Sequence, residues 1–344
     1  MKRKRTFYIT ALLTAVLTAC EHKDLCYMHP HTSEVHVLFD WSYAPEAETN
    51  QEVEGMCVWF YPVDETGEQT GEPLRFDLAA MKGGTVNLPA GRYNVLYYNN
   101  DYETVQFRNS GDFWNKECFT REGSLFEPVE GYAGTRADNS PRAEGTEDQR
   151  VVITPEMMWG DNAMNLEIGE NGLSYWFVRD GETEQTTIEN SDMRFTLMPH
   201  EQVCRYTLEI RNVEHLENVT QMCASLSGMS GSVFCATEAL QDEEVTLPFE
   251  ATPDGPSTIT AELYTFGHHP DNDEPHKLVL YTWMTDGTKW YYTFDVTRQV
   301  DEAPDRRHVH LVIDGLSLPE PIGEDSGFRP DVDGWTEENH DIIL

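Results

Sequence analysis

The sequence predicts an all-β protein with two domains, and three observations lead to that prediction. Beyond its first 19 residues the chain consists of short apolar runs separated by turn residues, with almost no helical period of useful length. Its 344 residues suffice for two domains, each with its own core. Two polar stretches, residues 134–150 and 181–191, interrupt the strand pattern.

The amino terminus has the form of a bacterial lipoprotein signal peptide. Four basic residues at positions 2–5 precede an apolar run, residues 7–17, that is too short to span a bilayer stably. Leu17-Thr18-Ala19-Cys20 follows. We therefore expect cleavage before Cys20 and attachment of fatty chains such as palmitate to it. The alternative is an ordinary cleavable signal in which a cysteine falls here by chance.

The charge of the mature chain limits its partners. Without residues 1–19 it carries 20 basic and 61 acidic side chains, a formal charge of −41. This balance argues against nucleic acid and against a polybasic contact with anionic lipid. Solubility and self-repulsion are the main interpretation, and cation binding or steering toward a basic partner is the alternative. No second apolar stretch approaches transmembrane length, so we expect lipid on Cys20 to be the membrane attachment.

In the first domain, strands are expected at residues 35–39, 56–61, 73–78 and 105–108. Residues 85–88 and 92–98 flank Pro89-Ala90-Gly91 and are expected to pair as a hairpin. We interpret residues 134–150 as a mobile exposed loop within this domain, because Val151-Val152-Ile153 resumes a strand pattern that fits the first core.

In the second domain, strands are expected at residues 193–197 and 204–213, followed by a hairpin at 279–296. Asp286-Gly287 is a two-residue turn signal that places Trp283 opposite Trp290. Alternation then gathers six side chains on one face, namely Val279, Tyr281, Trp283, Trp290, Tyr292 and Phe294. We interpret this face as the inner layer of a sandwich, with a platform for sugar rings as the alternative.

Residues that could carry chemistry are present, but none forms a specific motif. The histidine groups are His29 and His31, His308 and His310 on one strand face, and His268, His269 and His276 beside Asp271, Asp273 and Glu274. We interpret His308 and His310 as residues of a solvent-exposed strand face. The last group is interpreted as a solvated acidic loop that binds nothing specific. Asp331-x-Asp333-Gly334 fails as an EF-hand, since Arg329 and His340 take positions that require acidic ligands.

We therefore expect no catalytic residue, metal ligand or cofactor site, and no enzymatic activity. The sequence has no G-x-S-x-G, Walker, dinucleotide or H-E-x-x-H motif. Carboxylate pairs for glycoside hydrolysis stay an alternative, because the sequence does not give their separation. The remaining cysteines are Cys26, Cys57, Cys118, Cys204, Cys223 and Cys235. Buried free thiols are expected, with a Cys223–Cys235 disulfide as the alternative.

Several segments together resemble one family. They are residues 20–27 after the lipobox, residues 35–41, Phe60-Tyr61-Pro62, residues 88–93, residues 155–159, residues 224–229 and Phe266-Gly267. These look like segments of uncharacterised lipoproteins of gut and oral anaerobes, a group similar to fimbrillin-like proteins and in particular to their lipid-linked fimbrial anchors. The resemblance implies two tandem transthyretin-like, Greek-key β-sandwich domains on the outer membrane, facing outward at the cell surface.

The expected organisation is a signal peptide (1–19), a lipidated tether (20–33), sandwich domains (34–186 and 187–318) and an acidic tail (319–344). The resemblance implies an anchor or accessory subunit of a fimbria-like assembly, and a lipid-anchored glycan-binding module is the alternative. A pilin-like partner would add a strand to an exposed sheet edge. The tail either packs on its own domain or docks on a neighbouring subunit.

Overall fold

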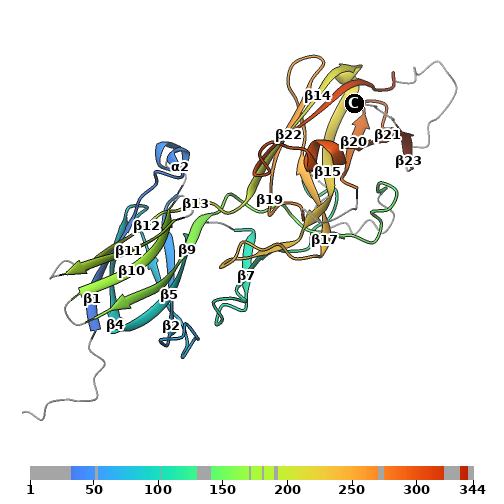
Figure 1. Cartoon of the computed structure of the whole chain (residues 1–344). Coiled ribbons are helices and arrows are strands. Elements are labelled where there is room, and N and C mark those ends of the chain that lie inside the picture. Colours follow the sequence, from blue (N-terminus) through green and yellow to red (C-terminus); the bar gives the residue numbers. More distant parts are fainter. Residues whose placement is uncertain are drawn as a thin grey trace, which may run out of the picture.

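The computed structural model describes residues 32–50, 53–101, 103–129, 141–169, 172–179, 182–189, 193–269, 275–320 and 334–339. This part of the chain is almost entirely β-structure, as the sequence predicts. Its short helices are α2 (Pro45–Asn50), α3 (Thr297–Asp301) and a 3-10 turn at Leu216–Asn218. No helix in these ranges is long and apolar enough to cross a bilayer. Figure 1 shows the strands in two lobes, with β7 lying between them.

Two sheets form the first lobe. The smaller has the order β12-β1-β4, with β1 (Thr32–Phe39), β4 (Gly83–Pro89) and β12 (Arg194–Leu197). The larger has the order β11-β10-β9-β5-β2-β3, with β2 (Met56–Val63), β3 (Leu74–Leu78), β5 (Gly91–Asn99), β9 (Trp159–Ile168), β10 (Gly172–Arg179) and β11 (Glu182–Glu189). A short strand, β13 (His200–Glu201), pairs with β9. Alternation buries Val35 and Val37 of β1 in one core with Phe60 of β2.

The hairpin expected across residues 89–91 is wrong. β4 pairs with β1, whereas β5 pairs with β2 and β9, so the turn carries the chain from one sheet to the other. Leu88 of β4 and Tyr93 of β5 consequently belong to the same core, between the sheets. Turn residues specify that the chain reverses, but the apolar faces decide which sheet receives the next strand.

The second lobe also contains two sheets. One has the order β18-β19-β14-β22, with β14 (Cys204–Glu214), β18 (Thr252–Pro253), β19 (Ile259–Thr265) and β22 (His308–Ser317). The other has the order β23-β21-β20-β15-β17-β8, with β8 (Arg150–Val151), β15 (Val219–Ser230), β17 (Glu244–Glu250), β20 (Lys277–Met284), β21 (Lys289–Asp295) and β23 (Trp335–Asn339). Tyr206 and Leu208 of β14 share the core between them with Leu226, Leu280 and Tyr292.

A three-stranded sheet connects the lobes. Its order is β16-β7-β6, with β6 (Val105–Arg108), β7 (Glu117–Thr120) and β16 (Ser232–Phe234). Cys57 and Tyr98 from the larger first-lobe sheet share a buried cluster with Cys118 of β7 and Val233 of β16. The junction therefore has an apolar core of its own, to which both halves of the chain contribute.

Described residues between 121 and 153 cover the outer face of the six-stranded sheet. Phe126 and Ala143 share a buried cluster with Tyr281, and β8 pairs in parallel with β17. Two expectations are therefore revised. Residues 141–149 form a loop, as expected, but it is partly buried, since Ala143 and Thr146 are only 2% and 3% exposed. Residues 151–153 do not join the first core, because Val152 lies in the second-lobe core. Residues 134–140 lie outside the described residues.

The domain boundary expected between residues 186 and 187 is too early. β12 pairs in parallel with β1, and β13 pairs with β9, so first-lobe strands continue to Glu201. The second lobe begins with β14 at Cys204. The apolar alternation at β12 indicated a strand, but a parallel pairing joins segments that are far apart in the sequence.

β20 and β21 form the expected hairpin, but its register is shifted by one residue. Trp283 lies opposite Lys289, and Trp290 lies opposite Thr282. The backbone N–H of Met284 donates to the carbonyl oxygen of Thr288 at 2.9 Å, which closes a three-residue loop, and Gly287 in that loop has φ 84°. A one-residue shift moves one strand's side chains to the other face. Trp290, Tyr292 and Phe294 therefore face away from Trp283.

Candidate functional site

Several residues that the sequence singled out lie outside the described residues. These are Cys20, Cys26, His29, His31, Asp271, Asp273, Glu274, Asp331 and Asp333. Lipidation of Cys20 therefore stays a prediction.

The five cysteines in the described ranges are free and buried. Cys223 and Cys235, the suspected disulfide pair, lie in different buried clusters, so that pairing is wrong. Burial raises the pKa of the Cys57 and Cys235 thiols to about 12. Thiols with such a pKa are protonated at neutral pH and react poorly as nucleophiles.

The histidines divide into two environments. His308 and His310 of β22 point to the exposed face, as expected, where His308 Nε2 is 2.9 Å from Glu201 Oε2. His268 and His276 are only 5% and 1% exposed, so the solvated-loop interpretation is wrong for them. Their rings meet edge to face at a centroid distance of 5.4 Å. The polar sequence between His268 and His276 gave no indication that these two imidazoles point into the protein.

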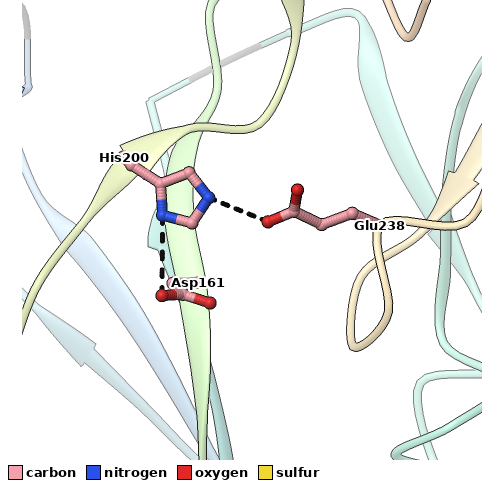
Figure 2. Close-up of side chains that lie close together, drawn as sticks. All are labelled: Asp161, His200 and Glu238. Atoms are coloured by element: carbon pink, nitrogen blue, oxygen red, sulfur yellow. Dashed lines mark hydrogen bonds and ion pairs between the residues drawn. The ribbon is translucent and has the colours of Figure 1, made fainter. Parts of the chain in front are cut away.

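Asp161, His200 and Glu238 lie together where the lobes meet (Figure 2). Asp161 is on β9, His200 on β13, and Glu238 in the loop after β16. His200 Nδ1 is 3.5 Å from Asp161 Oδ2, and His200 Nε2 is 2.8 Å from Glu238 Oε1. Gly160 permits the close approach of β9 and β5 here, because a Cβ would lie 2.3 Å from the carbonyl oxygen of Tyr97.

His200 and Glu238 carry charge at neutral pH. Burial alone would lower the pKa of His200, but Asp161 and Glu238 outweigh it and raise that pKa to about 9. Burial would raise the pKa of Glu238, whereas His200 and Arg307 lower it to about 2. Arg307 Nη2 lies 2.6 Å from Glu238 Oε2. The protonated imidazole of His200 and the carboxylate of Glu238 therefore join the lobes by a charge-assisted bond.

This cluster does not fit a metal centre. The carboxylates approach different ring nitrogens, although one ligand atom of each of the three residues lies within 4.8 Å of the others. A protonated imidazole donates from both nitrogens and carries no free ligand atom. Sequence reasoning missed the cluster, since no short motif contains two of its members.

The carboxyl-terminal strand β23 packs on its own lobe. It pairs in parallel with β21, with Trp335 opposite Lys289. The Trp335 ring lies 5.1 Å from Phe126, 5.0 Å from Trp283 and 5.6 Å from Tyr281, measured between centroids. We call these four residues the aromatic cluster. Residues 335–339 of the tail thus pack on their own domain, whereas the apolar end at residues 341–344, for which packing or docking was expected, lies outside the described residues. β23 thus occupies the edge that β21 would otherwise expose.

The sugar-ring platform expected as an alternative at this hairpin does not form. Trp283 is 7% exposed beneath Phe126 and Trp335, and Trp290 packs half-buried against the core on the opposite face. A sugar platform needs aromatic faces that share one open surface.

Comparison with known proteins identifies a family and a relative that are similar to this chain. A family model described as "Domain of unknown function (DUF5119)" matches residues 19–250. "Putative fimbrium anchoring subunit Fim4B" of Bacteroides ovatus is 28% identical over 169 residues, which are 49% of this chain and 43% of that protein. The matched stretch thus spans less than half the length of this curated relative.

Two solved structures are similar. A crystal structure of a "putative adhesin" from Bacteroides ovatus shares 21% identity and a TM-score of 0.55, covering 89% of this chain and 98% of that chain. The fimbrial anchor protein Mfa2 from Porphyromonas gingivalis has 16% identity, a TM-score of 0.44, and coverage of 82% and 91%. The first likeness shows a shared fold.

Proposed function

This chain belongs to the DUF5119 family, and from this premise we propose that it is a non-enzymatic anchor or accessory subunit of a fimbria-like assembly at the cell surface. The observation that carries the proposal is its 28% identity over 169 residues to the "Putative fimbrium anchoring subunit Fim4B". A structural role also suits the junction, where Asp161 and Glu238 are satisfied by His200 and Arg307.

We assign the membrane attachment to lipid on Cys20, with the mature chain on the outer membrane and facing outward. The support is the agreement of the basic start, the short apolar run and the lipobox. Metabolic labelling with a fatty-acid analogue tests it. Cys20→Ala should abolish incorporation and move the protein out of the membrane fraction. Cys26→Ala is the matched control and should label normally, whereas unchanged labelling of Cys20→Ala would exclude the assignment.

We assign the pilin-like partner to the β21 edge. In this proposal β23 covers the edge until a partner strand replaces it. Strand addition supplies affinity through main-chain hydrogen bonds and selectivity through side-chain pockets. The aromatic cluster supports the assignment, because removal of Trp335 would leave an apolar recess beside Phe126, Tyr281 and Trp283.

Affinity purification of the tagged full chain from its own cells tests the edge. Deleting residues 335–344 should increase the amount of a pilin-like protein that co-purifies, as identified by mass spectrometry. Deleting only residues 340–344 leaves β23 in place and should change nothing. If both deletions recover the same proteins as the full chain, or if no preparation recovers a pilin-like protein, the assignment is wrong.

A further inference from the structure

A cavity of about 470 Å³ lies beside the lobe junction. Its apolar wall consists of Val233, Leu240 and Phe266, and its polar wall includes His268, Arg306 and Arg307. The volume falls in the range of small-molecule sites, which combine apolar walls with a few convergent polar groups. Glu238 also lines the cavity, so the site adjoins the ion-paired cluster at the junction.

His268 in the wall of this cavity has a buried ring nitrogen whose hydrogen-bonding capacity is unused. The residue is 5% exposed, and its Nδ1 lies 3.0 Å from the hydroxyl oxygen of Tyr206. Its Nε2 is buried and has no hydrogen-bond partner among the described residues. If the Tyr206 hydroxyl donates to Nδ1, the proton of the neutral ring is on Nε2. The opposite tautomer would leave both the hydroxyl proton and the Nε2 lone pair unused, so the first arrangement is favoured.

The charges around the cavity favour an anion. Arg307 is paired with Glu238, whose other oxygen meets His200. Arg306 lines the cavity, and no ion pair or hydrogen bond joins its guanidinium to another described residue. His269 also lines it, with Nε2 3.5 Å from the exposed Asp242. An unpaired arginine is unusual in a chain whose formal net charge is −37.

We propose that this cavity binds a small monocarboxylate of about monosaccharide size. Its carboxylate would pair with Arg306, an acceptor oxygen would receive the Nε2 proton of His268, and its apolar part would lie on Phe266 and Leu240. Arginine presents its N–H groups in a fork that matches a carboxylate. A phosphate dianion fits less well, because the Glu238 carboxylate in the same wall repels a second negative charge.

Isothermal titration calorimetry on the purified full chain tests the proposal. Glucuronate and N-acetylneuraminate represent carboxylate sugars, lactate and glutamate represent carboxylates that are not sugars, and glucose is the uncharged control. At least one carboxylate should bind at micromolar to millimolar concentration, and glucose should not. Binding of the sugar acids alone or of the other acids alone identifies the source of the ligand, and either result supports the site.

Two arginine variants locate the binding. Arg306→Gln removes the unpaired charge from the cavity and should weaken carboxylate binding by about tenfold or more, as expected for loss of a bond to a charged group. Arg298→Gln makes the same charge change on α3, where the side chain is 76% exposed, and should bind normally. His268→Phe should also weaken binding, and its unfolding curve shows whether the fold survives. Equal binding of glucose, full binding by Arg306→Gln, or no binding at millimolar carboxylate would overturn the proposal, and none of these outcomes depends on the fimbrial role.

Discussion

At the residue scale, Lys116 shows how burial changes the protonation of an amine. Its side chain is fully buried, and its Nζ lies 3.4 Å from the centroid of the Trp59 ring. Nζ has no hydrogen-bond partner among the described residues. Burial lowers the pKa of Lys116 from 10.5 to about 7, so the folded protein favours the neutral amine. Wild-type stability therefore falls as the pH drops from 10.5 toward 7, because the unfolded chain binds the proton more readily.

Lys116→Met should stabilise the protein at neutral pH. Methionine has a similar shape and no charge to desolvate, so we expect a gain on the order of 2–4 kcal/mol at pH 7. The gain should shrink as the pH rises, and it should vanish above 10.5, where the wild-type amine is neutral in both states. Urea unfolding of the two proteins at pH 7 and pH 10 measures it. Equal gains at both pH values would show that packing, not charge, is responsible.

His200 should make the stability depend on pH in the opposite sense. Its pKa is raised to about 9 in the folded protein, so its contribution is complete below pH 6.5 and is lost as the pH rises through 9. About a third of the side chain is exposed, which limits the contribution to about 1 kcal/mol. His200→Gln should be less stable than wild type at pH 6 and equal to it at pH 9.5.

At acidic pH the stability of the same junction depends on Glu238, whose pKa is lowered to about 2. Its contribution is present above pH 4.5 and is lost as the pH falls toward 2, so Glu238→Gln should flatten that loss. His310→Gln, at a histidine 53% exposed on β22, is the control for both variants. If His310→Gln and His200→Gln change the unfolding midpoint equally, the junction ion pair contributes nothing specific.

At the scale of elements, the described residues between 121 and 153 and the strand β23 pack on the same face of the six-stranded sheet. Phe126 from the first and Trp335 from the second stack at 5.1 Å over Trp283 and Tyr281 of β20. Each element therefore buries apolar surface that the other leaves partly open. Loss of either should weaken the attachment of the remaining one.

Trp283→Ala should destabilise the second lobe by about 3–5 kcal/mol, the usual loss for a buried aromatic side chain. The side chain is 7% exposed and contacts both Phe126 and Trp335. Chemical denaturation monitored by circular dichroism measures the change. Trp114→Ala, at a tryptophan 49% exposed, is the matched control and should shift the midpoint little. A Trp283→Ala variant with a wild-type midpoint would show that the aromatic cluster does not stabilise the lobe.

At the scale of the whole molecule, the two lobes exchange segments. β8 and the described residues between 121 and 153 pack on the second lobe, whereas the chain returns to the first lobe for β9 through β13. β7 and β16 then pair at the junction, although they come from opposite halves of the chain. Cutting the sequence between the lobes therefore does not separate two complete cores.

A fragment of residues 202–344 should consequently fail to form a closed second lobe. Without residues 121–153, the side chains of Cys223, Tyr281 and Trp283 would lose the cover that Phe126 and its neighbours supply and would be partly open to solvent. We expect the fragment to bind a hydrophobic dye such as ANS and to unfold without a sharp transition. Fusing residues 117–153 ahead of residue 202 through a flexible linker should restore cooperative unfolding. A sharp transition in the bare fragment would contradict the shared core.

Local properties of this chain could be predicted from the amino-acid sequence alone. Alternation at residues 35–39 predicted β1, and the apolar run at residues 56–61 with its return at 73–78 predicted the paired strands β2 and β3. The excess of acidic side chains, 61 against 24 basic ones, argued against a nucleic-acid role, and the resemblance to fimbrial anchors rested on segments spread along the chain. These signals are local because side-chain period, turn chemistry and composition act within a few residues.

Strand register, the pairing of strands and the positions of buried polar groups became known only from the fold. One extra residue in the loop around Gly287 separated Trp283 from Trp290, and a turn that resembled a hairpin at residues 89–91 crossed between sheets. Asp161, His200 and Glu238 met because β9, β13 and the loop after β16 converge at the junction. The physical reason is common to all three: pairing and burial depend on which distant apolar face is available, and a short stretch of sequence does not encode its partner.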